Sequence, residues 1–503
     1  MFSALLLSWY DAHKRVLPFR GTKDPYRIWV SEIMLQQTRT ETVGAYYARF
    51  LQRFPDVFSL AAAPEEDVLK CWEGLGYYSR ARNLHKAAQT VAEQYGGEFP
   101  ADLKALRALP GVGDYTAAAV ASIAFDLPAP AMDGNLTRVL SRFHGVREDV
   151  GIPSVQRRLA ALAREDMPPV RCGDFNQALM DLGATVCIPG TPDCGRCPRR
   201  TLCDACRAGD ADALPVKAAA KPPVTVQLAV AIVTCHGRAL MVQRKEALLK
   251  NLWVFPLIEG AQNKKDVENG LKALGVRGNH TEKLGQARHV FTHRVWEMTL
   301  YRCQAADFSC KAGQYVSLAQ MNALPLPTAM RAAREKAAEL LAPVFVPAND
   351  ALLPDMARAY SASWRQAHQA HCSEAFLRQH TPQAMEALLR RRLAEGMDVF
   401  AVQSAGRTEG VLVLDKKNNE LVSLYIHPDA QGIGLGRAAA DFAVKTLDPA
   451  RDMRVTCLQS NEAARKLYIS CGFTQISAVR TLDESRDLRE EDRVRPAGRK
   501  EHL

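Results

Sequence analysis

Four cysteines near position 200 constrain the fold of this chain more tightly than any other feature of its sequence. They lie in the stretch CIPGTPDCGRCPRRTLC, where Cys187, Cys194, Cys197 and Cys203 follow the spacing C-x6-C-x2-C-x5-C. The Pro, Gly, Asp and Arg residues between them favour a surface loop and argue against unrelated buried cysteines. Four thiolates this close suit tetrahedral zinc or an iron–sulfur cluster, although zinc sites usually pair two C-x2-C units and this stretch has one. Cys206 lies just outside the spacing and is interpreted as a spare thiol.

Length and composition indicate a multidomain globular protein. At 503 residues the chain is too long for one ordinary core, which predicts about three domains. Hydrophobic residues make up 47% of the chain, charged residues make up 24%, and no apolar run is long enough to predict a membrane span. The stretch MFSALLLSWYDAHKR lacks a basic leader and a cleavage site, so we interpret it as a first helix. Because no export signal is evident, we expect a reducing cytoplasm, in which the cluster among the 13 cysteines binds metal and does not form disulfides.

The charge balance favours a polyanionic partner. The formal net charge is +10 at pH 7. A basic protein surface attracts nucleic acids, but a solvated basic surface without such a partner gives the same balance. Charge alone therefore leaves both interpretations open.

The pattern of apolar residues changes along the chain and divides it into parts. Residues 1–206 have mostly helical periodicity, and residues 207–223 are rich in Ala, Pro, Asp and Lys and are interpreted as a linker. Residues 224–342 mix strands with a closing helix, which predicts an α+β domain. Residues 344–480 predict an α/β domain, and the charged stretch 481–503 predicts a disordered tail.

A glycine hairpin lies between two apolar runs in the stretch LPGVGDYTAAAVAS. Leu109, Gly111 and Gly113 form the turn, and a helix is expected to follow it. Backbone amides at a helix N-terminus bind phosphate oxygens with the help of the helix dipole. The hairpin alone suits a phosphate-binding turn and an ordinary helix–helix turn equally well.

Six stretches within the first part, taken with the cysteine spacing, carry a resemblance to a known group of proteins. They are LPFR, SEIMLQQT, GLGYYSRARNL, LPGVGDYTAAAVASIAF, MDGNLTRVLSR and FNQALMDLGATVC. Residues 1–206 thereby resemble the helix-hairpin-helix DNA glycosylase superfamily and, within it, the MutY family of adenine DNA glycosylases. The resemblance implies an all-α fold, duplex DNA containing A:8-oxoguanine or A:G mispairs as partner, and a 4Fe–4S cluster on the four cysteines. It also implies a monomer in the cytoplasm, associated with the nucleoid.

Release of adenine requires two carboxylates with different roles, as in glycoside hydrolysis. By resemblance, Glu32 protonates adenine N7 and later activates water, while Asp133 stabilises the positively charged sugar. The apolar residues around Glu32 would raise its pKa by desolvation, as a general acid requires. The alternatives are a solvated helix residue for Glu32 and a helix N-cap for Asp133.

The resemblance also places residues around the base that leaves the duplex. Gln37 and Tyr77 would act as wedges at the opposing base, and Asn135 would lie beside Asp133. Two positions depart from common relatives, which often have tryptophan at Phe19 and in some cases glutamate at Gln177. The residues expected around the extruded adenine are Arg15, Leu17, Phe19, Arg20, Asn135 and Gln177.

Tyr115 bears on the type of reaction. In lyase-competent relatives of the superfamily, a lysine at this position forms a Schiff base with the sugar. A phenol cannot form one, so Tyr115 predicts a monofunctional glycosylase that leaves the DNA backbone intact.

Residues 224–342 resemble the C-terminal, Nudix-like domain of the same family. The stretches VQRKEALLKNLWVFPLIEG and HVFTHRVWEM carry this resemblance, but GAQNKKDVENGLKALG lacks the carboxylate cluster that a Nudix hydrolase uses to bind metal. We therefore expect recognition of 8-oxoguanine by Phe291, Thr292 and His293, without hydrolysis. A β-hairpin with a core phenylalanine is the alternative.

Residues 344–480 resemble the GCN5-related N-acetyltransferases (GNAT) through QGIGLG and SNEAARKLYISCGF. Amides of the loop formed by Gln431, Gly432, Gly434 and Gly436 would bind the pyrophosphate of acetyl-CoA. By resemblance, Asn461 would lie near the pantetheine and Tyr468 would protonate the departing thiolate; a core tyrosine is the alternative for the latter. The acetyl acceptor is not indicated.

The whole sequence thus predicts an adenine-specific glycosylase with an added acetyltransferase domain. One rival is a bifunctional glycosylase and lyase of the endonuclease III type, against which SEIMLQQT and the second domain argue. Another is an acetyltransferase with a DNA-targeting N-terminal module, against which Glu32 and Asp133 argue.

Overall fold

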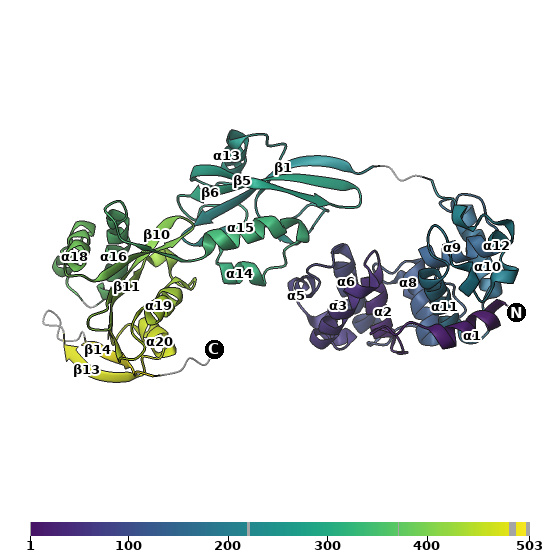
Figure 1. The fold of residues 1–503 in the computed structure, drawn as a ribbon, viewed down its shortest axis with the longest axis horizontal. Coiled ribbons are helices and arrows are strands. Elements are labelled where there is room, and N and C mark those ends of the chain that lie inside the picture. The colour runs from purple at the N-terminus through teal and green to yellow at the C-terminus, as the bar shows by residue number, and fades with distance from the viewer. Residues whose placement is uncertain (1, 219–221, 371, 482–488, 499–503) are drawn as a thin grey trace. The chain divides into compact units, whose positions relative to one another are not determined.

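The computed structural model describes residues 2–218, 222–370, 372–481 and 489–498. These residues divide into two compact units. The first unit contains residues 1–223 together with the short segments 244–252 and 325–328, and the second contains the remaining residues. Helices and loops build the N-terminal part of the chain, and two sheets with covering helices build the later part (Figure 1). The predicted order of an all-α part and two mixed parts is confirmed.

Twelve α-helices lie within the described residues up to 218, so helical periodicity predicted this part well. Short 3-10 turns at Cys194–Arg196, Arg200–Leu202 and Ala211–Ala213 follow the eleventh helix. The α-helices are α1 (Phe2–His13), α2 (Pro25–Leu35), α3 (Thr40–Arg53), α4 (Val57–Ala62), α5 (Glu65–Cys71), α6 (Ser79–Gln94), α7 (Leu103–Ala108), α8 (Asp114–Phe125), α9 (Gly134–His144), α10 (Pro153–Asp166), α11 (Cys172–Thr185) and α12 (Asp204–Ala208).

Local sequence signals start the two helices that later prove important. Asp24 caps α2 by accepting hydrogen bonds from the amides of Tyr26 and Arg27, and Pro25 occupies the first helical position. Asp133 caps α9 by accepting a hydrogen bond from the amide of Leu136. Helix α2 is buried from Ile28 to Met34, so it lies inside the helical unit and carries its one acidic residue, Glu32, into the core.

The stretch predicted as a linker is partly folded, which corrects that prediction for residues 207–216. Helix α12 extends to Ala208, and the guanidinium of the buried Arg142 donates a hydrogen bond to the carbonyl of Leu214. The amide of Val150 donates to the carbonyl of Val216. These contacts hold the stretch against α9 and the residues before α10, and residues 219–221 lie outside the described residues.

The second unit begins with a mixed sheet of seven strands in the order β3-β2-β1-β6-β5, with β4 also paired to β1 and β7 to β2. Strands β1 and β6 run parallel and β5 and β6 antiparallel. The predicted hairpin around CHGR is present, with Cys235 opposite Arg238. The strands are β1 (Val224–Cys235), β2 (Arg238–Gln243), β3 (Trp253–Val254), β4 (Leu257–Glu259), β5 (Gly278–Val290), β6 (Arg294–Ala305) and β7 (Gln314–Val316), and the helices are α13 (Lys264–Ala273), α14 (Leu318–Ala323) and α15 (Arg331–Leu341).

A second sheet of seven strands has the order β13-β14-β12-β11-β10-β9-β8. Helix α16 packs against β10 and β11, and α19 packs against β11. The strands are β8 (Val344–Pro347), β9 (Asp398–Ser404), β10 (Arg407–Asp415), β11 (Glu420–Ile426), β12 (Met453–Leu458), β13 (Gln475–Thr481) and β14 (Arg489–Arg495), and the helices are α16 (Leu353–His368), α17 (Glu374–Leu377), α18 (Pro382–Ala394), α19 (Leu435–Thr446) and α20 (Glu462–Ser470).

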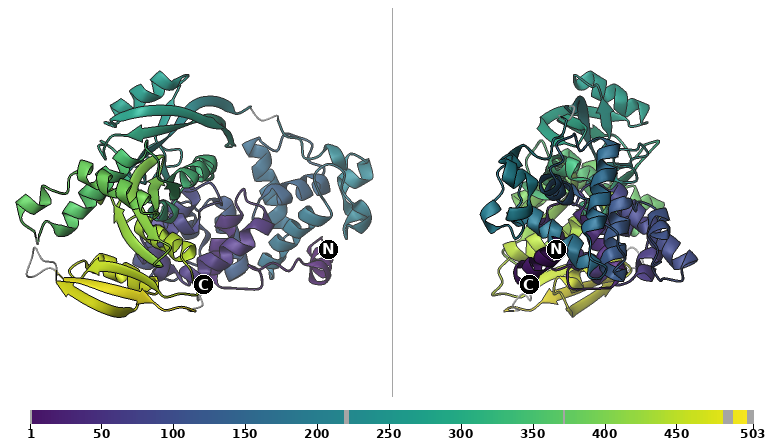
Figure 2. Two further views of the ribbon diagram at one scale, coloured as in Figure 1. Left: turned by 60° about the vertical axis from the view of Figure 1, so that its left-hand side comes forward. Right: turned by 90° about the vertical axis from the view of Figure 1, so that its right-hand side faces the viewer.

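Strand β14 corrects the prediction of a disordered tail from residue 481. It pairs with both β12 and β13, and the three views of Figures 1 and 2 show β13 and β14 side by side (yellow). Glu491, at its centre, is buried and accepts hydrogen bonds from Arg465 and Arg493, whereas Arg489 at its start is exposed. Mutual pairing thus allows a highly charged stretch to form a strand. Residues 482–488 and 499–503 lie outside the described residues.

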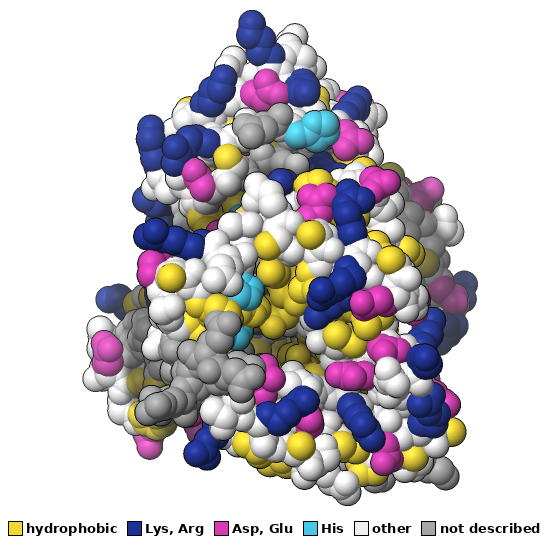
Figure 3. Space-filling view, turned by 90° about the vertical axis from the view of Figure 1, so that its left-hand side faces the viewer, with side chains coloured by type: hydrophobic (Ala, Val, Ile, Leu, Met, Phe, Trp, Pro, Cys, Tyr) yellow, Lys and Arg dark blue, Asp and Glu magenta, His cyan; other side chains and the backbone are white. Residues whose placement is uncertain are grey.

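The surface view bears on the polyanion hypothesis. On the face drawn in Figure 3, Lys and Arg side chains are interspersed with Asp and Glu side chains, and hydrophobic side chains line a central hollow. The net positive charge is therefore not gathered in one basic patch on this face. Within the described residues, no helix has the length and apolar character needed to cross a membrane.

Candidate active site

A cavity of about 610 Å³ in the helical unit brings together most of the residues predicted for catalysis and base binding. Its walls come from α2, α8, α9 and α11 and from the loops around them. The predicted residues that line it are Arg15, Leu17, Phe19, Arg20, Glu32, Gln37, Gly113, Tyr115, Asp133, Asn135 and Gln177.

Glu32 lies in this cavity with its carboxylate almost removed from solvent, since the residue is only 7% exposed. The Tyr115 hydroxyl donates a hydrogen bond of 2.6 Å to Glu32 Oε2. Burial raises the pKa of Glu32, and the Tyr115 hydrogen bond and the charge of Arg20 oppose this rise without cancelling it. Burial and Glu32 in turn hold the pKa of Tyr115 well above its usual value. The pair therefore favours a carboxylic acid beside a phenol that keeps its proton.

Asp133 faces the same cavity and is held by two hydrogen bonds. Its Oδ1 accepts one of 2.7 Å from the amide of Leu136, and its Oδ2 accepts one of 2.8 Å from Asn135 Nδ2. Burial raises the pKa of Asp133, while these hydrogen bonds oppose the rise because they favour the ionised form. The alternative of an N-cap is confirmed, since one carboxylate oxygen caps α9, and the group also lines the cavity.

The other residues predicted to contact DNA differ in whether their side chain or only their backbone is accessible. Gly111 has φ +73° and a Cβ there would lie 2.4 Å from Asn83 Cβ, so the turn itself requires glycine. Gly113 caps α8, and a Cβ there would meet no atom within 4 Å. The side chain of Leu109 is buried in the core, which leaves its backbone for any contact with DNA. Tyr77 does not line the cavity, has φ +48° and is 46% exposed.

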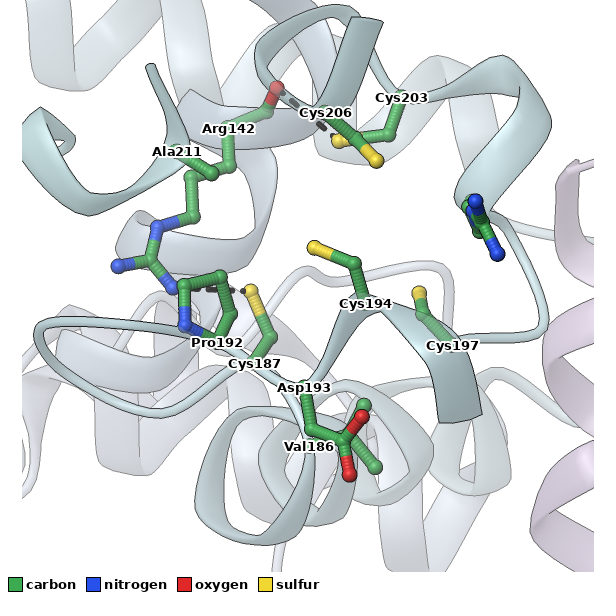
Figure 4. A pocket seen from close by; sticks show the side chains of 11 residues that line it. Arg142, Val186, Cys187, Pro192, Asp193, Cys194, Cys197, Cys203, Cys206 and Ala211 are labelled. Atoms are coloured by element: carbon green, nitrogen blue, oxygen red, sulfur yellow. Dashed lines mark hydrogen bonds between the residues drawn. The ribbon is translucent and has the colours of Figure 1, made fainter. Parts of the chain in front are cut away.

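The four predicted metal ligands surround a second cavity. Figure 4 shows the sulfur atoms of Cys187, Cys194, Cys197 and Cys203 around it, together with that of Cys206. Sequence spacing did not predict the presence of Cys206 there, which follows from its place in α12 directly after Cys203. Burial raises the pKa of Cys197 to about 11, so thiolates here need a cationic group to be stable. A metal cluster supplies such a group, and the donor set fits one.

Two arginines of α9 hold the cysteine loop, and one of them also links it to the first cavity. Arg142 donates to the sulfur of Cys187 at 3.4 Å and to the carbonyl of Ile188 at 2.8 Å. Arg138 donates to the carbonyl of Cys187 and to Asn135 Oδ1, both at 2.8 Å. Since Asn135 in turn holds Asp133, the cysteine loop and the acidic residue share one chain of hydrogen bonds.

The predicted reading loop joins β5 and β6. Thr292 and His293 are exposed, and the ring of Phe291 packs edge-on against Trp296 with ring centroids 5.0 Å apart. Phe291 is half-buried and is partly a core residue, as the alternative interpretation held. At the start of α13, the N-cap residue Asn263 and Asp266 form a capping box, and Glu268 pairs with Lys264. The two acidic side chains of α13 therefore each have a partner on or next to their own helix.

The glycine-rich loop precedes α19 in the second sheet's part of the chain. Gly432 and Gly434 have φ of +74° and +96°, the left-handed region that lets the chain turn into the helix. Strands β11 and β12 pair only at two positions near their beginnings and continue unpaired beside this loop. The two strands are not paired with each other beyond these positions, and the first amides of α19 are not used by the helix's own hydrogen bonds.

Two further predicted residues lie in α20. Asn461 caps the helix by accepting a hydrogen bond from the amide of Ala464. Tyr468 is buried in the core of this part, edge-on to Phe473, and burial raises its pKa far above the usual value. It keeps its proton, so the structure is compatible with both a proton donor and a core tyrosine.

Three family descriptions match successive parts of the chain. Residues 30–165 match the HhH-GPD superfamily of base excision DNA repair proteins, residues 229–336 match a NUDIX domain, and residues 360–487 match an acetyltransferase (GNAT) domain. This order confirms the fold classes expected from the sequence.

An adenine DNA glycosylase of Mus musculus is 37% identical over 351 residues, which are 58% of this chain and 68% of the relative. The chain belongs to the adenine DNA glycosylase family. Another member, from Buchnera aphidicola, is 33% identical over 59% of this chain and 84% of the relative. The solved structure of a thermostable thymine-DNA glycosylase is 33% identical, with a TM-score of 0.38, over 41% of this chain and 95% of that chain.

The structure of this glycosylase reveals two positioning residues that the sequence reasoning missed. Asp181 is fully buried, and its carboxylate accepts hydrogen bonds from Arg15 Nε at 2.6 Å and from Arg20 Nη1 at 2.5 Å. Burial would raise the pKa of Asp181, but the two arginines outweigh burial and hold it below its usual value. Asp181 therefore holds Arg15 and Arg20, which both line the cavity. The signal for it in the sequence was a charged residue among the mostly apolar residues near the end of α11.

Arg80 is the second such residue. Its guanidinium donates to the carbonyls of Ile33 and Met34, both at 2.9 Å, and to that of Gln36. These are carbonyls at the end of α2, where an α-helix leaves its last acceptors without partners. Arg80 therefore holds the segment that carries Gln37, which lies in the left-handed region at φ +55°.

We predict that Asp181→Asn weakens the helical unit by about 3 kcal/mol, because Arg15 and Arg20 lose a buried anionic partner. Hydrogen exchange of peptides from α1 and α11 measures this change as faster exchange. Asp174→Asn on the same helix is the matched control, since Asp174 forms an exposed pair with Arg171 that contributes at most about 1 kcal/mol. Equal effects of the two substitutions would contradict the positioning role of Asp181.

Proposed function

We propose that this protein is a monofunctional glycosylase that hydrolyses the N-glycosidic bond of adenine lying opposite 8-oxoguanine or guanine in duplex DNA. The observation that carries the proposal is the buried Glu32 carboxyl, hydrogen-bonded to Tyr115, in one cavity with Asp133. Family membership supports adenine as the base, since the relatives are named for it.

The reaction begins with protonation of the leaving base. Adenine enters the cavity after it leaves the base stack, because the bond to be broken is inaccessible within a duplex. Glu32 is suited to give its proton to adenine N7, since burial raises its pKa and so favours the acid form. The C–N bond then breaks, its electron pair leaves with the protonated base, and the sugar becomes an oxocarbenium-like cation.

Asp133 stabilises this cation. The hydrogen bonds from Leu136 and Asn135 hold its carboxylate in place and favour its ionised form. Water then adds to the sugar carbon and gives its proton to the Glu32 carboxylate, which restores the enzyme and leaves an abasic site. The Tyr115 phenol forms no Schiff base, so the sugar–phosphate backbone stays intact.

Elements of both units contact the duplex DNA. The amides at the start of α8, beside Gly111 and Gly113, contact a phosphate. Gln37 and Tyr77 fill the space near the opposing base. The exposed Thr292 and His293 read 8-oxoguanine, with Phe291 as an apolar neighbour. Because the substrate is chromosomal DNA, we place the enzyme in the cytoplasm with the nucleoid.

The two implied cofactors complete the proposal. Cys187, Cys194, Cys197 and Cys203 hold a 4Fe–4S cluster, which supplies a structural link between the end of α11 and α12 when bound. Strands β11 and β12 with the loop before α19 bind acetyl-CoA, and Tyr468 serves as proton donor to its thiolate. This part is a second, N-acetyltransferase function.

We predict that the protein removes adenine from a duplex with one A:8-oxoguanine pair, so that the strand breaks only after alkali. Glu32→Gln lowers the single-turnover rate by at least about 100-fold, because the general acid is lost. Glu41→Gln, which alters an exposed residue of α3, leaves the rate unchanged. An intact strand after alkali would overturn the proposal, as would full activity of Glu32→Gln; cleavage without alkali would contradict a monofunctional enzyme.

We predict about four iron and four sulfide ions per chain by chemical analysis. Cys197→Ser loses iron because it removes a ligand, whereas Cys206→Ser, which alters the neighbouring fifth thiol, retains it. Zinc in place of iron would overturn the cluster assignment. Loss of iron in Cys206→Ser with retention in Cys197→Ser would show that the ligand set is wrong.

A further inference from the structure

The turn between β1 and β2 of the Nudix-like domain lies against the proposed acetyl-CoA loop, and both belong to the second unit. Arg238, directly after this turn, donates hydrogen bonds to two loop carbonyls, that of Asp429 and that of Gln431, the latter at 3.0 Å. The contact therefore joins two domains that are distinct by sequence family.

The two carbonyls determine how the loop presents its amides. The amides of Ala430 and Gln431 already close a short turn by donating to the carbonyls of His427 and Pro428. The next amide, that of Gly432, belongs to the same peptide unit as the Gln431 carbonyl. In a trans peptide the C=O and N–H point in opposite directions, so Arg238 turns the Gly432 amide away from itself.

His236, in the turn just before Arg238, makes a second contact that holds the same loop. His236 lies 2.8 Å from the buried Glu409 carboxylate through Nδ1, and its ring stacks on that of His427 with centroids 5.1 Å apart and planes 10° from parallel. Its Nε2 lies 3.7 Å from Asp429 Oδ2. The side chains of His236, His427 and Asp429 therefore lie together where the turn meets the loop.

The Gln431 side chain holds the loop from the other side. Its Nε2 donates to the carbonyl of Ile426 at 2.9 Å, at the end of β11, and to Gln366 Oε1 at 3.0 Å. Gln431 thus has its backbone carbonyl fixed by the Nudix-like domain and its side chain fixed by the acetyltransferase domain. The conformation of the loop depends on both domains.

We propose that Arg238 of the Nudix-like domain is a positioning residue for the acetyl-CoA site and holds the loop in the conformation that binds pyrophosphate. This inference rests on the proposed acetyl-CoA function. It makes the Nudix-like domain a structural part of the acetyltransferase and gives a physical reason for the two domains to occur in one chain. Preorganisation of a binding loop raises affinity because less ordering is left to occur on binding.

Calorimetric titration of the full chain with acetyl-CoA tests the proposal. Arg238→Ala is expected to raise the Kd about tenfold, the effect of losing about 1.4 kcal/mol of preorganisation. Arg238→Lys, which keeps the charge but cannot bridge two carbonyls, is expected to lie between the parent and Arg238→Ala. Arg277→Ala is the matched control, since Arg277 forms an exposed pair with Asp307 in the same domain.

Hydrogen exchange without ligand provides the readout of positioning. Arg238→Ala is expected to speed exchange of peptides covering residues 427–436, with exchange in β9 and β10 unchanged. An unchanged Kd for Arg238→Ala, or an equal rise for Arg277→Ala, would overturn the role of Arg238 while leaving the acetyl-CoA site intact. No binding by the parent chain would overturn the acetyl-CoA site itself and this role with it.

Discussion

The hydrogen bond from the Tyr115 hydroxyl to the buried Glu32 carboxylate is the interaction on which the proposed chemistry depends. Burial in α2 raises the pKa of Glu32, and Tyr115 moderates that rise. Helix α2 can place an acidic residue in the core because the Tyr115 hydroxyl donates a hydrogen bond to the carboxylate there. In the same cavity, Arg15 and Arg20 form ion pairs with the buried Asp181, and these pairs hold the two arginines in the cavity wall.

Local sequence patterns predicted the fold classes, and the family resemblance named the residues that the structure brings to one cavity. Helical periodicity, the glycine hairpin and the cysteine spacing are signals within short stretches, and Asp133 could be identified as a helix cap from its neighbours alone. Buried charge networks could not be predicted in this way. Asp181, Arg80 and Glu491 each find partners from distant parts of the chain, and β14 exists because such partners neutralise its charges.

The same limit explains why the contact between the second and third domains was missed. Arg238 follows a turn that the sequence identified only as a hairpin. Its acceptors are backbone carbonyls, which every residue has, so no particular side chain in the sequence indicates the contact. Strand β1 connects that turn to the region of the reading loop, since its first residue, Val224, is paired with Arg294 beside His293. One strand thus has a proposed DNA contact near one end and a proposed acetyl-CoA contact near the other.

The pH dependence of adenine release in Tyr115→Phe tests the central claim most directly. Tyr115 stabilises the ionised form of Glu32, so its removal should raise the pKa of the general acid by about one unit. The acid form then persists to higher pH, and the alkaline limb of the single-turnover rate profile should move upward by that amount, while Glu41→Gln leaves it in place. An unchanged limb, or one moved to lower pH, would contradict Glu32 as the buried acid controlled by Tyr115.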